Sequence, residues 1–205
     1  MKRNMAVGMM CVVCMVTLLG AAAFWPGQEN DNIEKGMEMN EKDLAVEQAL
    51  VKMIAYYGND LRRTHHALKV HNFARTIGRL EGLSEQDLLT LELAAVMHDI
   101  GIPESERKYN SSAARYQEQE GPPVARELFK DLAIEPAIVE RVCFMVGHHH
   151  TYDKVDKTDF QILFEADYLV NMYEGKASKE RIISTQKRIF KTKAGNEIIN
   201  SMIKE

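Results

Sequence analysis

Two histidines and two aspartates occupy positions where the helical periodicity of the chain predicts apolar core residues: His66, His98, Asp99 and Asp167. A carboxylate buried among apolar side chains is costly unless it is paired or coordinates a metal ion. Two imidazoles and two carboxylates around one point suit a divalent transition metal ion. Four protein ligands leave positions open for water on a five- or six-coordinate ion, as metal-assisted hydrolysis requires. The residues therefore predict hydrolysis at a metal centre.

The register of the predicted helices is what places these side chains in the interior. A step of four residues back from Val70, which lies on an apolar stripe, reaches His66. In the next helix the stripe leads to His98, and Asp99 follows at the end of an apolar run. On a later helix the apolar face continues to Asp167. A single buried histidine is more often an ordinary core residue, so the prediction depends on the four residues together.

The elements that must position these residues are all helical. Helical periodicity begins at about residue 44, and no segment shows the sustained alternation of a strand. The predicted fold class is all-α, a single domain of about six to eight helices over 44–205. Helices are expected at about 44–57, 60–81, 84–98, 122–132, 136–149, 159–174, 178–190 and 195–204. The polar stretch 102–121 is interpreted as a long functional loop or as short helices.

Composition bounds the function classes. The 205 residues include 26 Lys and Arg against 30 Asp and Glu, a net charge of −4. Without the first 25 residues, 24 cations face 30 acids and the net charge is −6. This balance argues against nucleic acid as the main partner, although it does not exclude a local basic site. Three cysteines cannot form a disulfide framework, so the fold must depend on its core.

The N-terminal segment has two interpretations. Lys2 and Arg3 precede an uncharged run over 5–25, so residues 1–27 read as a signal peptide or a membrane anchor. Alternatively, translation starts downstream at Met37 or Met39, after codons that could include a bacterial ribosome-binding sequence. Residues 28–43 have the composition of a polar linker. The domain is cytoplasmic under the second interpretation and otherwise exported or anchored, so a membrane is expected as partner only through this segment.

Taken in order along the chain, these motifs resemble those of the HD-domain superfamily of metal-dependent phosphohydrolases. The matching pieces are His66-Ala67-Leu68-Lys69-Val70, Met97-His98-Asp99-Ile100-Gly101 and Glu165-Ala166-Asp167-Tyr168-Leu169. The resemblance covers roughly 45–175 and agrees with the all-α class.

The resemblance implies that His66, His98, Asp99 and Asp167 bind one divalent ion, for which a transition metal is favoured. It implies a water molecule, activated by that ion, that attacks a phosphomonoester or phosphoanhydride of a small molecule, with a nucleotide as the expected substrate. Asp99 is thereby both a ligand and a catalytic residue. One alternative is a non-catalytic nucleotide-binding or signalling module that retains the metal. A second is a structural ion that clips helices together. The oligomeric state is left open.

Negative charge that develops on phosphate calls for cations near the metal. Candidates flank His66 or lie in the stretch after Asp99, and each has the alternative role of a solvated surface cation. The candidate substrate-binding residues are Arg62, Arg63, Lys69, Arg107 and Lys108, with Arg115 as a further cation in the same stretch.

The general acid or base is less well defined. Ile102 stands where some HD subfamilies carry an acid or a lysine, which leaves Glu104 as the nearest candidate. His148 and His149 are candidates to contact phosphate or orient water, or to help hold a second ion. In the HD relatives that bind two metals, a further histidine is expected in the stretch before these histidines. Glu120 and Gly121 stand near that position in this chain, and this departure weakens the two-metal interpretation. An exposed and uninvolved histidine run is the remaining alternative.

Overall fold

The computed structural model describes residues 41–204, which form nine α-helices and one short 3₁₀ turn and contain no strand. The predicted leader 1–27 and nearly all of the linker 28–43 lie outside the described residues. The elements are α2 (Glu41–Tyr57), α3 (Leu61–Leu80), α4 (Glu85–Met97), α5 (Ile102–Tyr109), α6 (Ala114–Phe129), α7 (Pro136–Val146), η1 (Tyr152–Lys154), α8 (Thr158–Glu174), α9 (Lys179–Ile189) and α10 (Lys193–Met202). The all-α prediction is confirmed. None of the helices in this part of the chain is long and apolar enough to cross a membrane.

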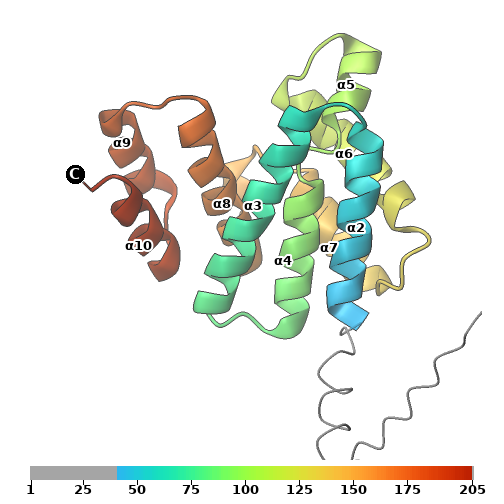
Figure 1. Ribbon diagram of the computed structural model, residues 1–205, viewed down its shortest axis with the longest axis horizontal. Coiled ribbons are helices and arrows are strands. Elements are labelled where there is room, and N and C mark those ends of the chain that lie inside the picture. Colours follow the sequence, from blue (N-terminus) through green and yellow to red (C-terminus); the bar gives the residue numbers. More distant parts are fainter. Residues whose placement is uncertain (1–40, 205) are drawn as a thin grey trace, which may run out of the picture. The chain divides into compact units, whose positions relative to one another are not determined.

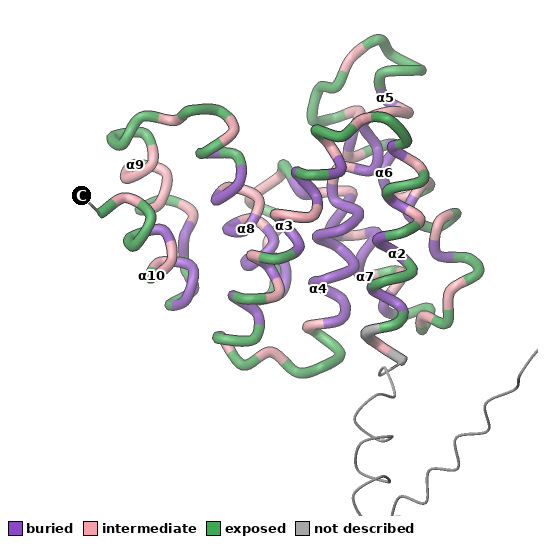
Figure 2. Tube along the Cα trace, viewed as in Figure 1, coloured by how far each residue is buried: buried purple, intermediate pink, exposed green. Residues whose placement is uncertain are grey.

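Helix α4 is the centre of the domain. It packs against α2, α3, α7 and α8, and every residue from Leu89 to Met97 is buried. Figure 2 shows α4 buried over most of its length, whereas its neighbours each expose one side. A helix that is apolar on all sides belongs in the interior of a protein. The end of α4, where His98 and Asp99 follow, therefore lies in the interior as well.

Local signals in the sequence set the ends of α3 and α4. Gly58 has a φ of 58°, which ends α2, and the Asp60 side chain then caps α3 by accepting a hydrogen bond from the Arg63 amide at 3.0 Å. Gly82, with a φ of 72°, follows the end of α3. Ser84 caps α4 by accepting from the Asp87 amide at 3.1 Å. These caps fix the register that turns His66 and His98 inward.

The region after Asp99 is more helical than the sequence indicated. The stretch 102–121 forms α5 and the first half of α6, in agreement with the short-helix alternative rather than a long loop. The prediction that Pro122-Pro123 opens a helix is wrong, because both prolines lie inside α6. A proline ring normally clashes with the Cβ of a helical residue before it. For Pro122 that residue is Gly121, which has no Cβ, so this clash is absent at the first of the two prolines.

Two glycines bring α6 against the turn that follows Asp99. A Cβ on Gly101 would lie 2.6 Å from the Gly121 amide nitrogen and would overlap the Gln117 carbonyl oxygen. A Cβ on Gly121 would lie 2.6 Å from Val146 Cγ1 on α7. Real Cβ atoms do not approach other atoms this closely, so glycine is required at both positions. This backbone contact holds α6 beside the candidate ligands.

A buried carboxylate anchors the C-terminal pair of helices to α8. Glu165 is fully buried and accepts hydrogen bonds from the Lys191 and Thr192 amides at 2.7 and 3.0 Å, and from the Thr192 hydroxyl. Gln161 also donates to it, at 2.7 Å. Hydrogen bonds to a carboxylate offset the cost of its burial. Glu165 is therefore a structural acid that connects α8 to the start of α10.

We expect Gly101→Ala to lower the free energy of unfolding by about 1–3 kcal/mol, because the new methyl group meets backbone that cannot rotate away. Gly121→Ala should cost less, since the Val146 side chain can shift. Gly58→Ala is the matched control for backbone strain alone: it has no atom within 4 Å of its Cβ and should cost about 1–2 kcal/mol. Urea denaturation measures all three. Equal costs for Gly101→Ala and a surface substitution such as Ser112→Ala would contradict the close contact.

Candidate metal centre

The structure brings His66, His98 and Asp167 together from three helices. His66 Nε2 lies 3.2 Å from His98 Nε2 and 3.1 Å from Asp167 Oδ1. His98 Nε2 lies 3.6 Å from the same Asp167 oxygen. One ligand atom from each residue lies within 4.8 Å of the others, a spacing that fits coordination of one ion. Unprotonated ring nitrogens that face each other at 3.2 Å repel, so a proton or a cation is needed between them.

Asp99 joins this cluster through one oxygen and faces a further histidine with the other. Its Oδ2 lies 3.6 Å from His66 Nε2 and 3.5 Å from His98 Nε2. Its Oδ1 lies 3.3 Å from Nε2 of His149, which is buried. The four residues singled out in the sequence are thus neighbours, and Asp99 lies between two groups of nitrogen ligands.

Each buried histidine presents Nε2 to the cluster because its Nδ1 is held from behind. His98 Nδ1 donates to the Ala95 carbonyl at 2.8 Å, and His149 Nδ1 donates to the Val146 carbonyl at 2.8 Å. His66 Nδ1 lies 3.1 Å from Glu174 Oε2, which accepts its hydrogen bond. An imidazole whose Nδ1 carries the proton has its lone pair on Nε2, the arrangement of most metal-binding histidines. The donor set of ring nitrogens and carboxylate oxygens fits a transition metal ion.

The electrostatics of the cluster favour a positive charge among its ligand atoms. Burial alone would lower the pKa of His98, but the charges of Asp99 and Asp167 raise it to about 9. Burial would raise the pKa of Asp99 and of Asp167, yet the pKa of each lies below its ordinary value because the facing histidines stabilise the ionised form. In the metal-free chain a proton on His98 supplies the charge that an ion would supply.

His149 and His150 form a second group with Asp99, whose ligand atoms also lie within 4.8 Å of one another. Within the described residues, His149 Nε2 is buried and has no hydrogen-bond partner. His150 Nε2 donates to Gln117 Oε1 at 3.1 Å. His148 points elsewhere, since its Nδ1 donates to the Phe144 carbonyl at 2.7 Å and its ring lies against that of Phe144. The histidine run is therefore divided: two members face Asp99 and one faces its own helix.

The candidate cations are mostly held by acids. Arg63 pairs with Asp60 at 2.8 Å and with Glu106 at 2.7 Å, and Lys69 pairs with Glu174. Lys108 contacts Glu120 at 2.6 Å. Arg62 is exposed and Arg115 lies over the Tyr116 ring. Of these cations, Lys69 has the most direct link to the cluster, because its partner Glu174 also holds His66.

Glu104 is a poor candidate for a general acid. It lies in the first turn of α5, where Arg107 contacts it at 2.6 Å and Lys108 at 3.2 Å. Hydrogen bonds from these two cations lower the pKa of Glu104 to about 2. The carboxyl group is therefore ionised at neutral pH and has no proton to donate. Ile102, at the position where an acid was sought, is buried.

Two residues at the site were not identified from the sequence. Glu174 follows Asp167 by two helical turns, with Asn171 between them, and Asn171 Nδ2 donates to Asp167 Oδ1 at 2.8 Å. This spacing on one face of α8 was a usable signal. Tyr57 ends α2, and its buried hydroxyl has no hydrogen-bond partner in the described part of the chain. Burial raises the pKa of Tyr57 and the charge of Asp99 raises it further, so the phenol stays protonated as a donor near Asp99.

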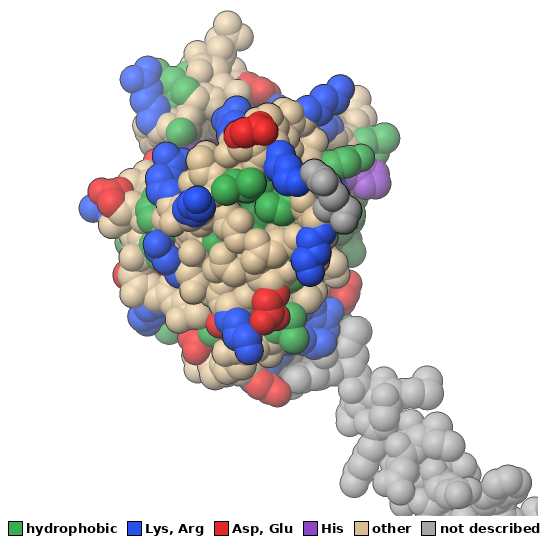
Figure 3. Space-filling model, turned by 90° about the vertical axis from the view of Figure 1, so that its left-hand side faces the viewer, with side chains coloured by type: hydrophobic (Ala, Val, Ile, Leu, Met, Phe, Trp, Pro, Cys, Tyr) green, Lys and Arg blue, Asp and Glu red, His purple; other side chains and the backbone are tan. Residues whose placement is uncertain are grey.

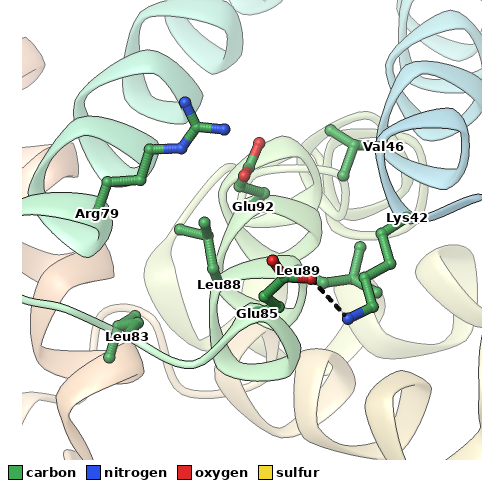
Figure 4. Close-up of a pocket in the computed structure, with 8 residues that line it drawn as sticks. All are labelled: Lys42, Val46, Arg79, Leu83, Glu85, Leu88, Leu89 and Glu92. Carbon is green, nitrogen blue, oxygen red and sulfur yellow. Dashed lines mark hydrogen bonds and ion pairs between the residues drawn. The ribbon is translucent and has the colours of Figure 1, made fainter. Parts of the chain in front are cut away.

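A pocket of about 340 Å³ between α2, α3 and α4 contains none of the candidate ligands. Figure 4 shows Arg79 and Glu92 lining it from α3 and α4, with the ion pair of Lys42 and Glu85 at its edge. Glu92 is buried and holds His71 at 2.8 Å. We therefore interpret these charges as links between the two helices.

Comparison with protein families supports the interpretation of the cluster. The HD domain family matches residues 63–172, a range that contains His66, His98, Asp99 and Asp167. The match covers more than half of the chain, and the protein belongs to the HD-domain family. No curated protein and no solved structure gave a significant match.

A divalent transition metal ion should stabilise the chelator-treated protein against heat, because it binds only the assembled cluster. Binding at 100 times the dissociation constant adds about 2.7 kcal/mol to the free energy of unfolding. Differential scanning fluorimetry with Mn²⁺, Co²⁺, Ni²⁺ and Zn²⁺ measures the rise in Tm. Asp167→Asn should remove most of the rise, whereas Glu104→Gln should retain it. An unchanged rise in Asp167→Asn would place the ion elsewhere.

Glu174→Ala should weaken metal binding about 10–100-fold, the usual effect of losing a partner that orients a ligating histidine. Glu174→Gln keeps a hydrogen-bond acceptor for His66 and should lose less. Isothermal titration calorimetry with the tightest-binding metal provides the measurement. Glu180→Gln, an exposed acid on α9, is the control and should bind like the wild type. A Glu174→Ala variant with normal affinity would show that Glu174 does not orient His66.

Proposed function

We propose that this protein is a metal-dependent phosphohydrolase that cleaves a phosphomonoester or phosphoanhydride of a small molecule, with a nucleotide as the favoured substrate class. The observation that carries the proposal is the convergence of His66 Nε2, His98 Nε2 and carboxylate oxygens of Asp99 and Asp167 at the end of the buried helix α4. Membership of the HD-domain family supports the reaction class. The preference for a nucleotide comes from the resemblance alone.

A divalent ion at this cluster would acidify water and polarise a phosphoryl oxygen. The chain's own residues hold and orient the candidate metal ligands. Glu174 fixes the ring of His66, and the Ala95 carbonyl fixes that of His98, so both nitrogens keep their direction during turnover. Asn171 holds Asp167 in the same way. Preorganised groups of this kind do not have to be reoriented as charge develops.

In this proposal, His149 and Tyr57 are the groups that transfer protons. His149 Nε2 faces Asp99 Oδ1 at 3.3 Å while its Nδ1 donates to the Val146 carbonyl, so the ring is placed to exchange a proton with an attacking water near Asp99 or to bind that water in place. Tyr57 carries a buried hydroxyl without a partner, which suits donation to a substrate oxygen or to water near Asp99. The pairing of Glu104 with two cations argues against its use as the acid.

A second candidate function is a binding module that keeps the ion and has no useful turnover. The ionised Glu104 and the apolar Ile102 favour it, because the positions considered for a general acid supply no proton. Both candidates predict metal binding and differ in whether bound nucleotide is consumed.

Wild-type protein loaded with a transition metal should release phosphate from at least one class in a panel of nucleotides and phosphomonoesters. Asp167→Asn should reduce kcat/KM by at least about 100-fold, which is more than the loss of a residue that only orients a metal ligand usually causes. His149→Ala should reduce kcat, whereas His148→Ala should remain close to wild type. Phosphate release and calorimetric binding are measured on the same samples. Saturable binding without product over a long incubation would favour the binding module. The absence of both binding and turnover would overturn both candidate functions.

A further inference from the structure

Positive charge is concentrated in the last part of the chain. Residues 176–205 carry eight Lys and Arg and three Glu, whereas residues 41–175 carry 15 Lys and Arg and 23 Asp and Glu. The overall net charge of −4 hides this separation. The helices α9 and α10 and their connections therefore form a cationic region on an acidic domain.

The cations lie on the outer side of these helices. No residue of α9 is buried, and its isoleucines Ile182 and Ile189 pack against the core from one side. The opposite side carries the exposed cations Arg181, Lys187 and Arg188 together with the exposed Glu180, and Lys179 is exposed at the first residue of the helix. Figure 3 views the side of the molecule on which α9 and α10 lie in Figure 1 and shows Lys and Arg side chains spread across it, with Asp and Glu side chains at several places between them.

Most of this charge is not neutralised within the chain. Over residues 41–204, Arg181, Lys187, Arg188 and Lys191 form no ion pair with an acid, and Lys193 reaches Glu197 only at 4.0 Å. By contrast, the Arg and Lys residues near the metal centre are largely paired, as described above. A set of exposed cations without intramolecular partners is a surface that attracts an anionic partner.

Exposed apolar groups lie on neighbouring elements. Tyr173 and Met202 are 76% and 45% exposed. They line a groove of about 430 Å³ between α3, α8 and α10, whose lining contains no residue of α9. Attraction of an anionic partner to α9 therefore depends on the cations and not on this groove.

The charge separation favours a membrane over a nucleic acid as the partner. A flat anionic surface meets only the α9–α10 side, while the acidic remainder of the domain points away from it. A long nucleic acid would extend past the cationic region and meet repulsion from residues 41–175. Of the interpretations of the uncharged run over 5–25, a retained anchor would also bring the domain to a membrane, whereas a cleaved signal peptide or a downstream start would not.

We propose that the cationic face of α9, formed by Arg181, Lys187 and Arg188, docks on a membrane surface that contains anionic lipids. Each Lys or Arg near such a surface contributes roughly fivefold to the binding constant at low salt. The contribution falls as ionic strength rises, because exposed charges are screened within about 10 Å at 0.1 M salt. The docking is independent of the metal ligands and does not rest on the proposed reaction.

The test uses the full chain with vesicles of phosphatidylcholine alone or with 30% phosphatidylglycerol. Hydrogen–deuterium exchange followed by mass spectrometry reports on the peptide that covers α9. We expect slower exchange in α9 on the phosphatidylglycerol vesicles only, and a loss of this protection as salt is raised. Because the readout is confined to α9, insertion of residues 5–25 into either vesicle does not imitate it.

Charge-reversal variants give the matched comparison. The double variant Lys187→Glu, Arg188→Glu should weaken the binding that protects α9 at least about tenfold. The double variant Lys52→Glu, Lys130→Glu makes the same change of net charge on the acidic part of the domain and should stay within about twofold of wild type. Circular dichroism and Tm show whether each variant is folded.

Three results would overturn the proposal. The first is unchanged exchange of α9 on phosphatidylglycerol vesicles, and the second is equal protection on phosphatidylcholine. The third is stronger protection of α9 by single-stranded RNA than by phosphatidylglycerol at the same concentration of negative charge, which would identify a nucleic-acid surface instead. If the double variant at Lys187 and Arg188 misfolds, the vesicle comparison with wild type still decides among these outcomes.

Discussion

Helix α4 is buried along most of its length and then delivers an imidazole and a carboxylate into the same interior. Asp99 cannot remain ionised there without positive charge nearby, and Asp167 arrives from α8 with the same need. His98 itself, His66 from α3 and His149 after α7 meet this need, and the Nδ1 atom of each ring is in turn held by a carbonyl or by Glu174. The caps of α3 and α4 and the contact of Gly101 with α6 can be understood as the means of keeping these charges in register.

This dependence explains why the cluster could be predicted from the sequence. A polar residue on an apolar stripe is rare, so His66, His98 and Asp167 stood out, and the order of the motifs indicated the family. The same logic did not reach Glu174, because a glutamate at the end of a helix is ordinary in a sequence. Tyr57 was hidden for a different reason: a tyrosine on an apolar stripe looks like a core residue, and only the structure shows that its hydroxyl lacks a partner.

The helices were predicted well where apolar periodicity and caps agreed, as in 60–81 and 159–174, and poorly where tertiary contact outweighs local preference. Helix α6 continues through Pro122 and Pro123, where Gly121 removes the clash at Pro122 and where α7 and the turn at Gly101 pack against the helix. The outer face of α9 is a related case. Its composition reads as an ordinary solvated helix, and only the structure shows that Arg181, Lys187 and Arg188 have no acidic partner within residues 41–204.

The contact between Gly101 and Gly121 also has a consequence for how this domain can diversify. It fixes where α5 begins and where α6 passes the site, whereas the connection between those helices is held by a hydrogen bond from Gln117 Nε2 to the Ser112 carbonyl at 2.5 Å and by one within the connection itself. That connection, residues 110–113, begins with Asn110 in a left-handed conformation, and Ser112 and Ala113 are exposed. Lengthening an exposed loop with fixed ends costs little free energy. Insertions into residues 110–113 would not move the candidate metal ligands, so this connection is where the domain can acquire additional substrate-binding residues.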